Sequence, residues 1–155
     1  MMVPVVVAAD PGSREALALM RELSGVLERL TGDAGLSGFE AEDLRPPHGV
    51  FLIALDDEGA PIGCGGFRRR GDGAVEIKRM FARPGAAGVG TQILAALERR
   101  AVEAGHRCIL LSTRRVNARA VRFYERRGYE EIAPYGAYVG RPESICMARV
   151  LTLAD

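Results

Sequence analysis

A glycine-rich segment is the part of the sequence best suited to bind an anion. It runs Gly85-Ala86-Ala87-Gly88-Val89-Gly90-Thr91, between a strand-like run and a helical pattern. A helix start there leaves backbone N–H groups unpaired at the positive end of the helix dipole, which suits a pyrophosphate. Gly88 and Gly90 permit close approach of the backbone, and Thr91 adds a hydroxyl. Such a segment is also an ordinary way to begin a helix.

Other phosphate motifs do not fit this segment. It lacks the GK[ST] of a P-loop, and its glycines follow a hairpin strand instead of opening the first βαβ unit of the chain. A different phosphate-bearing cofactor is therefore indicated.

A second pair, Asn117 and Tyr124, lies in VNARAVRFYERRGY. Seven residues span about two helical turns, so the two side chains share a face. A phenol in that position can donate a proton to a leaving group of similar pKa, such as a thiolate. The alternative is structural, with Tyr124 packing beside Phe123 as a helix anchor and Asn117 capping the helix.

The elements that position these residues follow from periodicity and turn residues. A β-branched run, Val3 to Asp10, precedes a helix capped by Ser13 and ended by Thr31-Gly32-Asp33. We expect the apolar face of that helix to comprise Leu17, Met20, Leu23, Leu27 and Leu30. A short helix is expected from Glu40 to Leu44.

Three strands in an antiparallel meander come next, at Gly49–Leu55, Pro61–Arg69 and Ala74–Ala82. Strict alternation in the third strand places Glu76, Lys78 and Met80 on one face and Val75, Ile77, Arg79 and Phe81 on the other.

The remaining pattern alternates helix and strand. Helices are expected over Gly88 to Ala104 and Asn117 to Arg127, and strands over Arg107 to Thr113, YEEIA and Ser144 to Leu151. In the helix from Gly88 to Ala104, the side chains expected to face inward are Ile93, Leu94, Leu97 and Ala101. The passage from Val75 to Leu111 predicts a right-handed crossover between parallel strands. The fold class is therefore mixed α+β, in a single domain covering residues 1–155.

Composition excludes several function classes. Twenty-one Lys and Arg against 20 Asp and Glu give a net charge of +1, without a field that would attract nucleic acid. Arg68-Arg69-Arg70 and Arg114-Arg115 are expected to be solvated surface, since no aromatic residues interleave them. No apolar run is long enough to cross a membrane, and no signal peptide is evident, so a cytoplasmic location is expected. Three scattered cysteines and two isolated histidines argue against a disulfide framework and a metal site.

Together the two motifs resemble the GNAT superfamily of acetyl-CoA-dependent N-acetyltransferases. The likeness rests on a strand followed by RPxxxGxG (Met80 to Gly90) and then on NxRAxxFYERRGY (Asn117 to Tyr129), in that order. PYGAYVGRPESICMARVL also resembles the C-terminal part of a bacterial subgroup with a PY-loop and an SxCM strand. The resemblance implies the GNAT fold, with a mostly antiparallel central sheet, a splayed parallel strand pair and helices on both faces.

The resemblance also assigns residues to the cofactor and to catalysis. Met80-Phe81-Ala82 would pair with the pantetheine amides, and a backbone N–H there would hold the carbonyl oxygen. Tyr124 would protonate the departing thiolate, and Arg126 would reach the adenosine phosphate. The implied cofactor-binding set is Met80, Phe81, Ala82, Gly85, Ala87, Gly88, Val89, Gly90, Thr91, Asn117, Ala120, Phe123 and Tyr124. Acetyl-CoA is the implied cosubstrate, with no metal, and the acceptor is a small-molecule or peptide amine that the sequence does not identify.

Four points stay open. Gly85 stands where the family usually has a long polar residue, which would weaken cofactor binding, so an acyl-CoA-binding module without turnover and a non-enzymatic interaction domain are alternatives. Glu76 is the candidate general base, although it could instead be a strand-face carboxylate paired with Lys78 or Arg69. Arg79, Tyr135 and Tyr138 are candidates for the acceptor pocket. A homodimer through an edge offered by the terminal strand is a further alternative.

Overall fold

The computed structural model describes residues 3–36 and 39–152, and within them one mixed sheet forms the centre of the molecule. Its order is β1-β2-β3-β4-β5-β7-β6, and all neighbouring pairs are antiparallel except β4 with β5. The strands are β1 (Val5–Ala8), β2 (Gly49–Leu55), β3 (Pro61–Arg69), β4 (Ala74–Ala82), β5 (Cys108–Arg114), β6 (Glu130–Ile132) and β7 (Ser144–Val150). The expected mostly antiparallel sheet with one parallel pair is confirmed.

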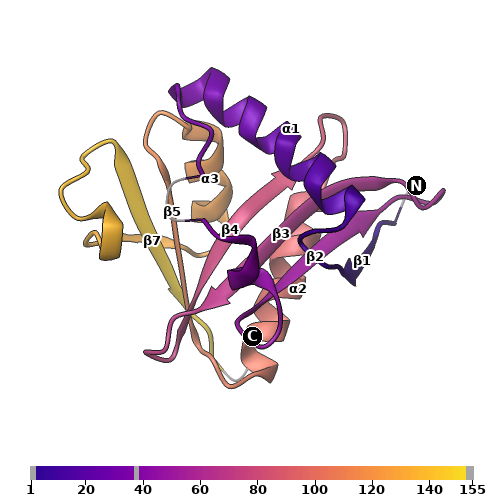
Figure 1. Ribbon diagram of the computed structural model, residues 1–155. Helices are drawn as coiled ribbons and strands as arrows, with labels where there is room; N and C mark the ends of the chain where they lie inside the picture. The colour runs from indigo at the N-terminus through magenta and orange to yellow at the C-terminus, as the bar shows by residue number, and fades with distance from the viewer. Residues whose placement is uncertain (1–2, 37–38, 153–155) are drawn as a thin grey trace.

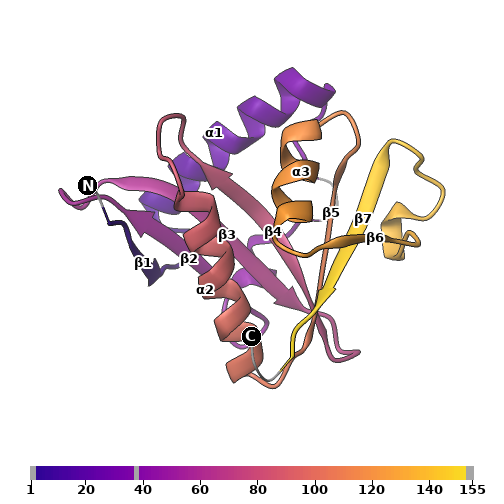
Figure 2. The same cartoon turned by 180° about the vertical axis from the view of Figure 1, so that it is seen from behind.

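Helices cover both faces of this sheet. Figure 1 shows α1 crossing one face, and Figure 2 shows α2 and α3 on the other. The helices are α1 (Arg14–Thr31), α2 (Val89–Glu103) and α3 (Ala118–Arg126), with short 3₁₀ turns η1 (Ala41–Leu44) and η2 (Gly136–Tyr138). Two apolar clusters result. The larger joins α2 and α3 to the sheet, and the smaller joins α1 and η1 to it.

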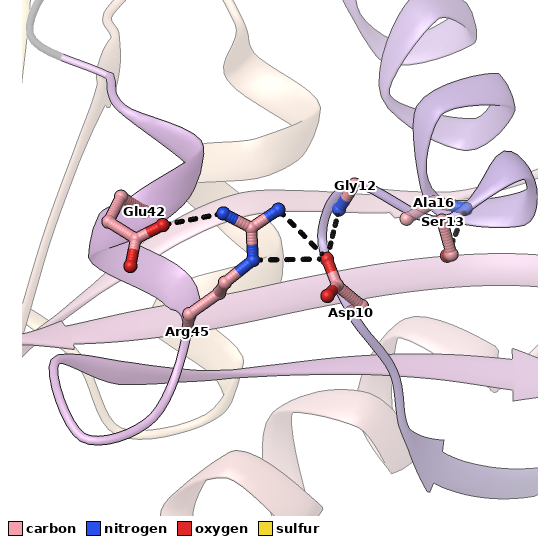
Figure 3. A network of polar contacts seen from close by, with 6 residues as sticks. All are labelled: Asp10, Gly12, Ser13, Ala16, Glu42 and Arg45. Carbon is pink, nitrogen blue, oxygen red and sulfur yellow. Dashed lines mark hydrogen bonds and ion pairs between the residues drawn. The ribbon is translucent and has the colours of Figure 1, made fainter.

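Polar contacts fix the start of α1. The Ser13 side chain caps the helix by accepting a hydrogen bond from the backbone N–H of Ala16 (3.3 Å), as predicted. Just before it, Asp10 accepts hydrogen bonds from the backbone of Gly12 (2.6 Å) and from the guanidinium of Arg45, which also pairs with Glu42 (Figure 3). These contacts tie the start of α1 to η1.

The buried face of α1 differs from the predicted one. Met20 and Leu23 are buried as expected, but Leu17 and Leu30 are 40% and 47% exposed. The fully packed positions are Ala16, Leu19, Met20 and Leu23. The prediction chose the wrong stripe in the first turns, because Ala16, Leu19, Met20 and Leu23 also recur at three- and four-residue steps, on a face rotated away from Leu17.

The face assignment along β4 was also wrong beyond Lys78. Cys64 of β3 pairs with Phe81, but Gly66 pairs with Lys78, so one extra residue of β4 lies between these pairs. The left-handed backbone of Arg79 (φ 59°) marks this β-bulge. After the bulge, Met80 packs with the α2 cluster and Phe81 with the α1 cluster, the reverse of strict alternation.

Other expectations are largely confirmed. The meander strands have the predicted bounds, and Ile93, Leu94, Leu97 and Ala101 of α2 are fully buried. The terminal strand β7, however, is not a sheet edge, because β6 pairs with it on the side away from β5. The strand β6 covers Cys146, Met147 and Ala148 of the edge expected for dimerisation, and the homodimer stays a prediction.

Candidate active site

The parallel strands β4 and β5 separate along their length. Their pairing is confined to Ala74–Glu76 of β4 and Cys108–Leu110 of β5, while β5 continues to pair with β7 as far as Arg114. Both cartoon views show the two strands diverging, with α3 beside the gap in Figure 2. Backbone groups of β4 after Glu76 therefore face β5 without a ladder partner, which leaves them available to an extended ligand.

Arg79 lies at the bulge of β4, beyond the last β4 residue that pairs with β5. Its guanidinium donates hydrogen bonds to the Met20 carbonyl (2.8 Å), the Ser24 hydroxyl (2.7 Å) and the Ala34 carbonyl (3.3 Å). Burial lowers the pKa of Arg79, although a guanidinium remains protonated at neutral pH. Arg79 lines the cleft described next, but these contacts commit its guanidinium to fixing α1 against β4.

A cleft of about 220 Å³ lies where the strands part. Its walls come from α1, the segment after α1, β4, β5, α3, the loop before β7 and the start of β7. The lining residues include Leu23, Leu27, Asp33, Lys78, Met80, Ser112, Arg114, Asn117, Ala120, Tyr124, Tyr138, Arg141, Glu143 and Ser144. Of the predicted site residues, the structure brings Met80, Asn117, Ala120 and Tyr124 together here. Glu76, Phe81, Phe123 and the segment from Gly85 to Thr91 are not among the lining residues.

Tyr124 is held rigidly at the cleft wall. It is 7% exposed, and its ring packs edge-to-face against Phe123 (5.1 Å between centroids) and Tyr129 (5.7 Å). Burial raises the pKa of Tyr124, so its hydroxyl is protonated at neutral pH. Within residues 3–36 and 39–152 that hydroxyl has no hydrogen-bond partner. It is therefore a proton donor available to a ligand in the cleft.

Asn117 caps α3. Its side-chain oxygen accepts a hydrogen bond from the backbone N–H of Ala120 (3.3 Å), which is the structural role considered for it. Because Asn117 also lines the cleft, its side-chain amide N–H groups remain available to a ligand.

The start of α2 carries the predicted set of unpaired donors. Gly88 is the N-cap, and both Gly85 (φ 86°) and Gly88 (φ 79°) adopt left-handed backbone that favours glycine. The backbone N–H groups of Ala87, Gly88, Gly90 and Thr91 donate to no backbone carbonyl in the described chain. The N–H of Val89 differs, because it donates to the Ala86 carbonyl (3.3 Å). This cradle fits an anion through four amides.

Sequence reasoning missed a basic residue beside this cradle. Arg127, directly after α3, donates a hydrogen bond to the hydroxyl of Thr91 and lies over the ring of Phe123, 4.8 Å from its centroid. Phe123 in turn lies against Gly90, where a Cβ would come within 3.4 Å of the ring. Arg126 is the last residue of α3, and its expected contact with the adenosine phosphate stays a prediction.

Glu76 is fully buried in a polar network on the face of β4 opposite the α2 cluster. Its two oxygens accept hydrogen bonds from Arg68 (2.7 Å) and the Tyr135 hydroxyl (2.7 Å), and the Lys78 ammonium lies 3.5 Å away. Lys78 also donates to the Tyr138 hydroxyl (3.0 Å). Burial by itself raises the pKa of Glu76, but Lys78, Tyr135 and Arg68 together lower it below its ordinary value. The network joins β4 to the loop that carries the two tyrosines.

Comparison with known proteins identifies the family. The model of the acetyltransferase (GNAT) family matches residues 17–129. The chain belongs to the GNAT family of acetyltransferases. It is accordingly an acyltransferase, and the split strands and the α2 amide cradle lie within the matched region.

Individual relatives agree with this family. An "IAA acetyltransferase" from Azospirillum brasilense is 30% identical over 151 residues, covering 95% of this chain and 98% of that protein. A Klebsiella pneumoniae protein assigned as an acyl-CoA N-acyltransferase has a TM-score of 0.83 at 26% identity, with 97% and 99% of the two chains covered. A Bacillus anthracis protein assigned as a streptothricin acetyltransferase, solved with acetyl coenzyme A, shares the fold (TM-score 0.64, 22% identity, 76% and 72% covered).

Among the described residues no helix combines the length and hydrophobicity needed to cross a bilayer. Nor do these residues contain a group of three or more histidine, cysteine, aspartate or glutamate side chains placed to hold a metal ion.

Proposed function

We propose that this GNAT protein transfers an acetyl group from acetyl-CoA to a primary amine by direct attack within a ternary complex. The observation that carries the proposal is the gap between β4 and β5, which opens onto the Tyr124 hydroxyl. A ligand with a pantetheine arm fits this arrangement, because its amides can pair with the unpaired backbone of β4 while its pyrophosphate lies at the α2 amides.

The residues divide the work by their contacts. The amides of Ala87, Gly88, Gly90 and Thr91 hold the pyrophosphate, and Arg127 supplies the positive charge that Gly85 does not provide. Asn117 and Ala120 line the arm's path, and the backbone around Met80 to Ala82 holds the carbonyl oxygen.

The step itself balances without another reactant. The neutral amine nitrogen forms a bond to the acetyl carbonyl carbon, the carbon–sulfur bond breaks, and Tyr124 gives its proton to the departing sulfur. The amine nitrogen releases a proton to solvent as the amide forms, and the Tyr124 phenolate takes up a proton from solvent, so the number of protons is balanced.

Glu76 fits this scheme poorly as a general base. Both of its oxygens are occupied, its pKa is lowered, and its side chain does not line the cleft. We propose instead that Glu76 positions Lys78 and the tyrosine loop, and that the amine is deprotonated in solvent before it binds.

The test is a calorimetric titration with acetyl-CoA followed by a transfer assay on a panel of primary amines, read by coenzyme A release and product mass. Micromolar binding with transfer and intersecting initial-rate lines supports the proposal. Binding without transfer to any amine supports the alternative of an acyl-CoA-binding module. No binding at millimolar acetyl-CoA, or a parallel-line rate pattern, overturns the proposed ternary complex.

A further inference from the structure

Three polar side chains gather on one face of the β5–β7 pair. Ile109, Leu111, Ile145 and Met147 pack into the α2 cluster. Because side chains alternate along a strand, Ser112, Arg114 and Ser144 lie on the opposite face, toward α1. Arg114 and Ser144 are direct cross-strand partners, which places their Cβ atoms about 5 Å apart. All three residues line the cleft.

Of the arginines that line the cleft, Arg114 is half-buried and forms no side-chain hydrogen bond or ion pair within the described residues, whereas Arg141, which also forms no ion pair, is exposed. Lys78 is paired with Glu76, and the Arg79 guanidinium is bonded to α1. The neighbour Arg115 is paired with Glu131 (2.5 Å). Within the described ranges Arg114 forms no ion pair, and its buried Nε has no hydrogen-bond partner.

The two serines complete an anion-binding arrangement. In the described chain the hydroxyls of Ser112 and Ser144 donate no side-chain hydrogen bond to protein, so both are available to a ligand. A guanidinium flanked by two hydroxyls matches the acceptor atoms of a carboxylate. The cleft carboxylates Asp33 and Glu143 are exposed at its mouth and do not pair with Arg114.

We propose that the acceptor amine also bears a carboxylate, which binds Arg114, Ser112 and Ser144 while the amine lies at the gap between β4 and β5. This inference rests on the proposed function. Leu23 and Leu27 of α1 line the same cleft, so the acceptor carries an apolar group as well. The acceptor class is therefore an apolar amine with a carboxylate, as in an apolar amino acid.

The test compares matched acceptors that differ in charge. Leucine, methionine and phenylalanine are compared as acceptors with their carboxamides. Replacing the carboxylate by a carboxamide lowers the pKa of the amine, so kcat/KM is calculated from the concentration of the neutral amine form. We expect the carboxylates to be favoured by about tenfold, the size of one charged hydrogen bond. Arg114→Gln should abolish that preference, Arg114→Lys should restore part of it, and the control Arg115→Gln should keep it.

Failure of this inference is distinguishable from failure of the proposed function. Acetyl-CoA binding by Arg114→Gln, measured in the same calorimeter, should equal that of the unaltered protein. Equal or better use of the carboxamides, or a carboxylate preference that survives in Arg114→Gln, overturns the inference. If no member of the panel is acetylated, calorimetry measures whether the amino acids bind to the complex of the protein with coenzyme A. Absence of that binding overturns the inference about the carboxylate, while the binding of the cofactor stays established.

Discussion

The two sides of the cleft are built from different materials. The α2–α3 side presents unpaired backbone amides and aromatic rings that are close in sequence to one another. The α1 side presents charged and hydroxyl side chains of β4, β5 and β7, and those of β4 are bonded to segments distant in the sequence. Backbone amides can hold an anion whatever side chains stand beside them, whereas a site built from side chains changes with each substitution.

The first prediction concerns the aromatic side. Tyr124→Phe removes the proton donor but keeps the ring packing, so kcat should fall by about 100-fold while acetyl-CoA affinity stays within about twofold. Initial rates and calorimetry measure the two quantities. Tyr129→Phe is the matched control, since it removes a hydroxyl that bonds Glu98 in the same aromatic cluster but outside the cleft. Equal loss of kcat in both variants would show that Tyr124 acts only through packing.

The second prediction concerns the polar network of the acceptor side. Glu76→Gln leaves Arg68 and Lys78 without their counter-charge, and the free energy of unfolding should fall by about 1–3 kcal/mol at pH 7. Since the folded state lowers the pKa of Glu76 below its ordinary 4.5, its stabilisation is present above that pH and is lost as the pH falls through the folded value.

Denaturant unfolding between pH 3 and pH 7 measures this effect. The unaltered protein should lose stability on acidification more steeply than Glu76→Gln. Under our proposal Glu76→Gln raises KM for the amine more than it lowers kcat. A kcat loss that is largest above the pKa of Glu76 and shrinks as the pH falls, with KM unchanged, would instead favour Glu76 as the general base.

The third prediction tests whether Arg127 supplies the positive charge near the start of α2 that Gly85 does not provide. Arg127→Gln removes a charge beside the α2 amides, so acetyl-CoA should bind about tenfold more weakly, with kcat at saturation unchanged. Arg126→Gln, an exposed neighbour, is the control and should change affinity less than Arg127→Gln does. If Arg126→Gln weakens binding more, the assignment from the family resemblance holds over the one from structure.

The smallest expected effect is that of Thr91→Val. It removes the hydroxyl that Arg127 contacts and leaves the backbone amide in place, so acetyl-CoA affinity should fall by about two- to fivefold, within the range for a neutral hydrogen bond. Calorimetry of the double variant with Arg127→Gln checks the coupling. Strictly additive losses would mean that Thr91 does not position Arg127.

The sequence by itself determined the local features. Ser13 and Asn117 are caps because their short side chains reach the third backbone N–H along the helix. The strands of the meander have their predicted bounds, since β-branched runs and glycine turns are short-range signals. Gly88 begins α2 for the same reason. The family, too, was evident from two short motifs.

Only the tertiary structure decided which side chains meet. The bulge at Arg79 reverses the faces of Met80 and Phe81, and it depends on contacts with α1, some 55 or more residues earlier. Arg127 reaches Thr91, and Tyr135 reaches Glu76, through loops whose paths no local pattern encodes, whereas Arg68 and Glu76 are cross-strand partners in the β3–β4 hairpin. Local propensity fixes elements because it acts over a few residues, whereas partners across the fold are set by how those elements pack.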